Sequence, residues 1–248
     1  MNLTAQQIID QEGHLKGFFP FVEIAIDLKQ LPFDFQIAFF ASCYERALPI
    51  YMLVNGRVGW GDISILRSVG DDLWKIAGGM QIQEETIKNI ICKVAEIFIE
   101  DDESDNEDDE SDNYYAESRD GVIYVLIIEE FSRFIIQILN YIERDTPENY
   151  LQIFINLLYI MREYFSTHFP NIDPEWEFKK SGRKQRMIEL NTAEMQAEIC
   201  KELEDLDFLE KTPKLTPEIL ATFRANAACA PGMSILGSLD EVRSNLEW

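Results

Sequence analysis

The segment from residue 39 to residue 51 constrains the fold of this chain more than any other. It reads Phe-Phe-Ala-Ser-Cys-Tyr-Glu-Arg-Ala-Leu-Pro-Ile-Tyr, so an acid and a base, Glu45 and Arg46, stand side by side in an apolar run. The apolar residues predict a buried helix. Because a buried charge is costly unless it is paired, each of the two must find a partner inside a helical core.

Glu45 and Arg46 point about 100° apart on a helix and therefore cannot pair well with each other. On the next predicted helix, Arg67 and Asp71 have the i,i+4 spacing of a local pair, with Asp72 one position further on. These five residues form the candidate polar cluster. It either binds a small anion and performs acid–base chemistry, or is an ion-pair network that fixes how two helices cross. The second interpretation is favoured, because no nucleophile or set of metal ligands accompanies the cluster.

Helix start and stop signals recur along the whole chain. Asp62 caps one predicted helix that Gly78 and Gly79 end, and Thr216 with Pro217 opens another. We find no strand alternation, so the sequence predicts an all-α, single-domain multi-helix bundle of roughly eight helices. The main predicted helices span 34–54, 63–77, 84–99, 122–142, 146–167, 192–210 and 217–229, with short ones after Thr4 and at 240–246. Pro49 is predicted to kink or split the first of these.

A repeated acidic heptad interrupts the helical pattern. Glu100–Asn106 is repeated unchanged at 107–113, and ten of these fourteen residues are Asp or Glu. Such a density of like charge repels itself and buries no apolar area. We therefore predict a long acidic loop over 100–118. Its acids are the candidate partner-binding residues: Asp101, Asp102, Glu103, Asp105, Glu107, Asp108, Asp109, Glu110 and Asp112.

The charge balance bounds the classes of partner. The chain has 248 residues, with 22 Lys and Arg against 45 Asp and Glu, for a formal net charge of -23. This excess disfavours nucleic-acid backbone and anionic membrane surfaces, and it favours association with a basic protein. The apolar segment 122–142 contains Glu129, Glu130 and Arg133, which indicates a buried helix rather than a membrane span.

The residues that usually hold metals or perform redox chemistry are sparse. Four separated cysteines, with no C-x-x-C pair, are predicted to be buried reduced thiols, which together with the absence of a signal peptide indicates a cytoplasmic protein. His14 and His168 belong to no zinc-binding spacing, and the acidic heptads lack the glycine of a calcium-binding loop. We therefore expect no metal, no cofactor and no enzymatic activity.

Two blocks of sequence carry a family resemblance. The first block contains Cys43, Glu45, Arg46, Pro49, Tyr51, Gly59, Gly61, Asp62, Arg67, Asp72 and Trp74. The second contains Ala197, Glu198, Leu203, Leu206, Leu209, Glu210, the run 215–218 and the closing run 232–237. On these residues the chain resembles the YjaG-like family, a bacterial group defined as a domain of unknown function. The family usually closes on a Ser-Asn-Ile-Gly-like run, where this chain has Ile235 and Leu236 instead. The resemblance implies an all-α fold and no activity.

The resemblance also suggests how the chain is divided. We predict an N-terminal extension over 1–32, a YjaG-like helical domain over 33–237 that includes the acidic loop, and a C-terminal tail over 238–248. The favoured function is a non-enzymatic acidic interaction protein, for example an immunity protein or inhibitor that neutralises a basic nuclease toxin. The alternatives are a small-ligand binder or enzyme that uses the polar cluster, and a structural or assembly subunit. The oligomeric state is left open.

Overall fold

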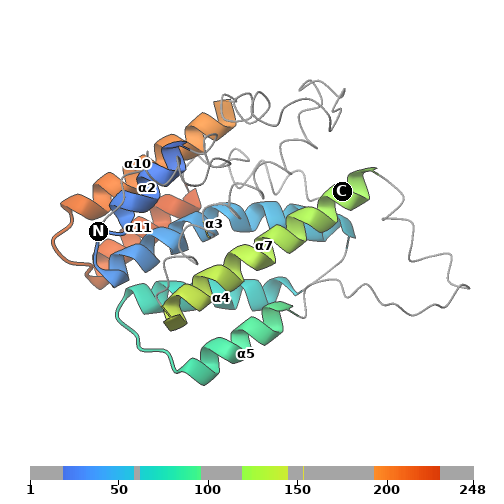
Figure 1. Ribbon diagram of the computed structural model, residues 1–248, viewed down its shortest axis with the longest axis horizontal. Coiled ribbons are helices and arrows are strands. Elements are labelled where there is room, and N and C mark those ends of the chain that lie inside the picture. The colour runs from blue at the N-terminus through green and yellow to red at the C-terminus, as the bar shows by residue number, and fades with distance from the viewer. Residues whose placement is uncertain (1–18, 59–61, 96–118, 145–152, 154–192, 230–248) are drawn as a thin grey trace, which may run out of the picture. The chain divides into compact units, whose positions relative to one another are not determined.

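The fold is known from a computed structural model that describes residues 19–58, 62–95, 119–144, 153 and 193–229 (Figure 1). Seven helices and no strand lie within these residues. The all-α prediction is therefore confirmed for this part of the chain. The acidic loop, the segment 154–192 and both histidines lie outside the described residues.

The chain divides into two compact units, each assembled from separate stretches of sequence. Of the described residues, the first unit contains 19–46, 70–81 and 193–229, and the second contains 47–58, 62–69, 82–95, 119–144 and 153. This division does not follow the predicted boundaries at 32 and 237, and those boundaries remain a prediction.

The first unit contains helix α2 (Phe19–Leu28), the first half of α3 (Phe33–Val58), the end of α4 (Ile63–Ala77), α10 (Ala193–Lys211) and α11 (Pro217–Cys229). Helix α2 packs against α10, as Figure 1 shows. It buries Ile24 and Leu28 completely, so this part of the predicted extension belongs to the core of the unit. The ring of Phe223 on α11 stacks on Phe208 of α10, with 5.2 Å between ring centroids, and meets Trp74 of α4 edge-on at 6.0 Å.

The start and stop signals in the sequence are found at the helix ends. The Asp62 carboxylate accepts a hydrogen bond from the Ser64 backbone N–H at 2.7 Å. The side chain of Ser64, followed by its backbone N–H, lowers the pKa of Asp62 through these hydrogen bonds. Helix α4 ends at Ala77, and Gly79 just beyond it has a φ of 89°, the left-handed conformation that favours glycine. Thr216 accepts a hydrogen bond from the Ile219 backbone N–H at 3.3 Å and opens α11. The predicted limits of these two helices are confirmed.

Of the two effects predicted for Pro49, the split of the first long helix is wrong, and the kink stays a prediction. Helix α3 runs through Pro49 and continues to Val58, beyond its predicted end at 54. Proline removes one backbone hydrogen bond from a helix interior. The residues that follow it, Ile50 and Tyr51, are fully buried, and burial of their side chains offsets that loss.

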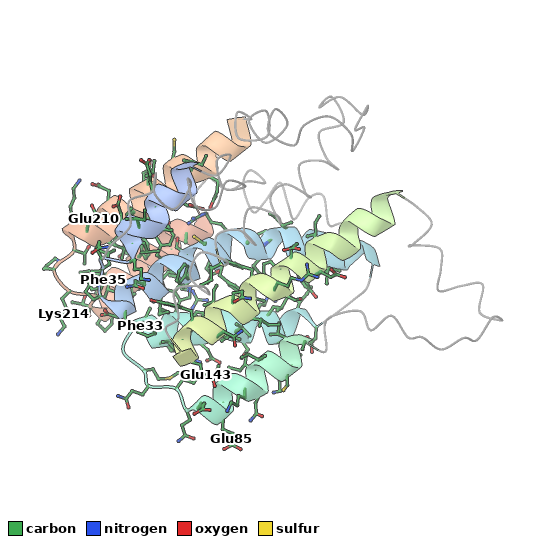
Figure 2. The ribbon with its side chains drawn as sticks, in the orientation of Figure 1. Phe33, Phe35, Glu85, Glu143, Glu210 and Lys214 are labelled. Carbon is green, nitrogen blue, oxygen red and sulfur yellow. The ribbon has the colours of Figure 1, made fainter. Side chains whose placement is uncertain are left out.

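The second unit contains the rest of α3 and α4, together with α5 (Glu84–Ala95) and α7 (Arg119–Arg144). Helices α5 and α7 pack against each other, and Lys88 of α5 lies 3.8 Å from the carboxylate of Glu143 on α7, which is labelled in Figure 2. Phe131 of α7 contacts Tyr51 of α3, with 5.1 Å between ring centroids. Burial, followed by the charge of Asp62, raises the pKa of Tyr51 to about 12.

The charged residues of helix α7 differ in exposure, and the side chain of Glu143 is only 8% exposed. Arg133 is exposed and pairs with Glu130 at 2.6 Å and with Glu129 at 3.0 Å, while Phe134 and Ile135 beside it are fully buried. Among the described helices, none has the length and apolarity needed to cross a lipid bilayer.

Candidate functional site

Arg46 of α3 lies at the centre of a buried network in the first unit. Its side chain is 1% exposed and donates from Nε to Glu198 Oε1 at 2.8 Å and from Nη1 to Asp205 Oδ2 at 2.7 Å, both on α10. Nη1 also donates to Ser42 Oγ at 2.7 Å, and Ser42 in turn donates to Asp205 Oδ2 at 2.7 Å. Nη2 lies 3.5 Å from the Cys43 sulfur. The guanidinium therefore joins α3 to α10 through charged hydrogen bonds shielded from water.

A second cation completes the network from α10 itself. Lys201 is buried and donates to the other oxygen of Asp205, Oδ1, four residues further along the helix. The carboxylate of Asp205 thus accepts hydrogen bonds from Arg46, Ser42 and Lys201. Each oxygen of this buried carboxyl group therefore has a hydrogen-bond partner, as buried polar groups generally do.

Glu202, one turn from Glu198 on α10, is the exception in the network. Its side chain is fully buried, and neither of its carboxyl oxygens has a hydrogen-bond partner. The second oxygen of Glu198 also lacks a partner. The network therefore holds three carboxyl groups, those of Glu198, Glu202 and Asp205, against the two cations Arg46 and Lys201.

Burial and mutual charge shift the protonation of these groups. Burial raises the pKa of Glu202 well above its ordinary value, and the neighbouring Glu198 raises it further. Burial also raises the pKa of Glu198, although Arg46 opposes that rise. For Arg46, burial lowers the pKa, but Glu198, Cys43 and Asp205 together more than reverse this and raise it well above the ordinary value. Burial raises the pKa of the Cys43 thiol, which makes it a poor nucleophile.

Glu45, the neighbour of Arg46, belongs to a different and more exposed network. Its Oε1 accepts a hydrogen bond from the indole Nε1 of Trp74 at 2.9 Å and another from Nε of Arg224 on α11, also at 2.9 Å. Arg224 further donates from Nη2 to Asp71 Oδ1 at 2.5 Å and lies over the Trp74 ring, 5.9 Å from its centroid. One arginine thus connects α11 with α3 and α4.

A pocket opens beside this second network. It has a volume of about 320 Å³, at the lower end of the range for small-molecule sites. Its lining combines charged residues and a tryptophan with apolar residues of α11 and the preceding loop. The lining residues are Asp71, Trp74, Lys75, Gly78, Leu215, Pro217, Leu220 and Arg224.

The five predicted cluster residues do not gather at one place. Arg46 lies in the buried network, and Glu45 and Asp71 share Arg224. Asp72 pairs with Lys75 at 2.7 Å on the surface. Arg67, in the second unit, is exposed and contacts the sulfur of Met52 at 4.0 Å. The expected local pair between Arg67 and Asp71 is not formed, and Asp71 accepts a hydrogen bond from Arg224 instead.

The sequence reasoning missed the partners that α10 and α11 supply. Residues 198, 201, 202 and 205 follow the i, i+3, i+4, i+7 spacing of one helix face. Because all four are charged, this stripe is typical of a solvent-facing surface, whereas it is buried here. Leu203, on the opposite side of the same helix, is 48% exposed. The available signal for burial of the charged face was therefore an apolar residue opposite the charged stripe.

The cysteines of the described residues differ in their exposure to water. Cys43 is buried and free, but Cys92 and Cys200 are exposed free thiols, so the prediction that all four are buried is wrong for these two. Both lie on outward positions of α5 and α10, where a small side chain is tolerated. Within the described ranges, no group of three or more His, Cys, Asp or Glu is arranged to hold a metal ion.

Comparisons of the whole chain with known proteins add no family or relative. The resemblance to the YjaG-like family stays a prediction based on the residues given above. Protein-family models, curated proteins and solved structures were all compared with this chain, and none of them matches it.

Proposed function

We propose that this protein is a non-enzymatic interaction protein that binds a basic protein partner, as an inhibitor of a basic nuclease toxin would. The observation that carries the proposal is the excess of 45 acidic over 22 basic residues, a net charge of -23. A field of this size speeds encounter with a cationic partner and suppresses encounter with anionic ones.

Within the described residues, the outward face of α10 supports this proposal. It presents the exposed acids Glu204, Asp207 and Glu210, and Leu203 stands among them with 48% of its surface exposed. An apolar side chain surrounded by charge is the usual composition of a contact site, with an anchor at its centre and a polar rim. The acidic residues 101–112 remain part of the proposal as additional contacts.

The pairing of Glu45 and Arg46 favours this function over catalysis. Glu45 accepts hydrogen bonds from Trp74 and Arg224, and Arg46 is held between Glu198 and Asp205. Groups that are so paired fix the crossing of helices, and they have little freedom to exchange protons with a substrate.

A pull-down with the immobilised protein tests the proposal. We expect a basic protein to be retained at low ionic strength and released near 1 M salt, where the Debye length falls to about 3 Å. The triple variant Leu203→Ser, Glu204→Gln, Asp207→Asn should weaken this binding at least about tenfold, the value of one apolar anchor and its rim. The matched control is Glu85→Gln, an exposed acid on α5 in the second unit (Figure 2).

Two results would count against the proposal. Failure to retain any basic protein at low salt would contradict it directly, and equal loss of binding in the α10 variant and the Glu85 control would remove α10 from it. Replacement of 100–113 by a short neutral linker then measures the share of the acidic segment. Unchanged binding in the linker variant would leave that segment with no role in recognition.

A second candidate function, the binding of a small ligand, is favoured by the pocket beside Trp74. It is lined by Asp71 with one sign of charge, by Lys75 and Arg224 with the other, and by apolar residues of α11 and the preceding loop. This composition suits a small zwitterion with an apolar side chain, such as a free amino acid. Ligand-observed NMR with a panel of L-amino acids tests it. Binding lost in Arg224→Gln but kept in Arg133→Gln would establish the site, and no binding at millimolar concentration would exclude it.

A further inference from the structure

The buried network of the first unit contains one more acid than its cations can match. Arg46 pairs with Glu198 and Asp205, and Lys201 also pairs with Asp205. Glu202 has no partner for either oxygen, although it is fully buried. An isolated carboxylate in such a place would cost far more than protonation does, so a buried acid of this kind becomes neutral.

We propose that the folded first unit carries Glu202 as a neutral carboxylic acid, so that this unit binds one proton on folding and α10 loosens from α3 when that proton is lost. The proton goes to Glu202 rather than to the other acids, because Glu198 and Asp205 each accept a charged hydrogen bond from Arg46. The inference is independent of the proposed function.

The charged and titratable groups that act on Glu202 come from two helices. Helix α3 contributes Arg46 and the thiol of Cys43, and α10 contributes Glu198 and Asp205. The third helix packed on α10 is α2, which presents the apolar residues Ile24 and Leu28 and has both its acids, Glu23 and Asp27, exposed. Among the described residues, the two buried cations of the network, Arg46 and Lys201, already pair with Glu198 and Asp205, so neither is left to replace the proton on Glu202.

The sign of the pH dependence follows from the direction of the shift. The pKa of Glu202 is raised on folding, first by burial and then by Glu198. The stability that this group contributes is therefore fully present below its ordinary pKa of about 4.3 and is lost as the pH rises through the raised value. Over that window the folding equilibrium constant falls up to tenfold per pH unit through this one group.

The test compares the wild type with Glu202→Gln, which has nearly the same shape and does not ionise. Urea unfolding is followed by circular dichroism from pH 4.5 upward, in steps of about one pH unit. We expect the ratio of folding constants, variant over wild type, to rise about tenfold per pH unit until the folded pKa is passed. The matched control Glu210→Gln, exposed on the same helix, should give a flat ratio.

A ratio that stays constant with pH, or a glutamine variant that is destabilised equally at every pH, would overturn the proposal. Either result would mean that Glu202 is ionised and paired in the folded protein. If the glutamine variant does not fold, Glu202→Leu takes its place in the comparison, because leucine does not ionise and needs no hydrogen-bond partner. Infrared spectra give an independent readout: a protonated carboxyl band above neutral pH in the wild type, absent from the variant, supports the proposal, and its absence from the wild type refutes it.

Discussion

Two ion-pair networks begin on neighbouring residues of α3 and differ in their exposure to water. Arg46 is 1% exposed and pairs with carboxylates that are also buried, whereas the side chain of Arg224 is 41% exposed and its partner Asp71 is 51% exposed. Both networks connect helices that are distant in sequence, and both have hydrogen bonds shorter than 3 Å. The comparison teaches that similar geometry gives very different energies, because water screens one network and is excluded from the other.

The largest expected effect comes from removing the buried cation. Arg46→Met should destabilise the first unit by about 3–5 kcal/mol, because Glu198 and Asp205 would then be buried without it. The loss of stability is measured as the shift in the urea midpoint of unfolding. The control is Arg133→Met on α7, where the same change in a half-exposed ion pair should cost about 1 kcal/mol or less. Equal costs for the two variants would abolish the distinction between buried and exposed networks.

An intermediate effect is expected where α3 packs on α4. A Cβ added to Gly70 would lie 2.8 Å from a ring carbon of Tyr44, which is fully buried, so Gly70→Ala forces the two helices apart. The cost of about 1–3 kcal/mol should exceed the gain of about 1 kcal/mol in helix propensity. Since Gly70 and Tyr44 directly precede Asp71 and Glu45, this variant should also disturb the Arg224 bridge.

A double-mutant cycle separates the clash of the new methyl group with Tyr44 from the gain in helix propensity. With Tyr44→Leu already present, the shorter side chain leaves room for the new methyl group, and Gly70→Ala should become neutral or stabilising. A cost that stays the same in this background would show that contact with the Tyr44 ring is not its cause.

The smallest effect is expected from the exposed network. Arg224→Gln should cost about 1 kcal/mol or less, and the cost should shrink as salt is added. Thermal unfolding at two ionic strengths measures both. A salt-independent loss as large as that of Arg46→Met would mean that the Arg224 network excludes water in solution, and the comparison would then fail.

Local signals predicted the fold well, and they predicted the polar networks poorly. Asp62, Gly79 and Thr216 act through their own backbone neighbours, so their roles follow from the sequence alone. Pro49 misled because its local effect is opposed by burial of Ile50 and Tyr51, which depends on distant residues. A sequence pattern reports what is favourable locally, and packing decides the rest.

The polar residues show the same limit more strongly. The sequence required a partner for Arg46 but did not indicate which helix supplies it, since Glu198 lies 152 residues away. It suggested Arg67 as the partner of Asp71 because the spacing is local, whereas the structure uses Arg224, 153 residues away. Which face of a charged helix is buried is a property of the assembled unit, and the stripe on α10 therefore escaped detection.

The long separation between Arg46 and its carboxylates has a consequence for synthesis of the protein. Helix α3 leaves the ribosome well before α10. Arg46 therefore has no carboxylate partner from α10 until more than a hundred further residues have been added to the nascent chain. Contacts this distant in sequence form slowly, since the intervening chain must first be closed into a loop. The first unit can therefore complete its core only after α10 has been synthesised.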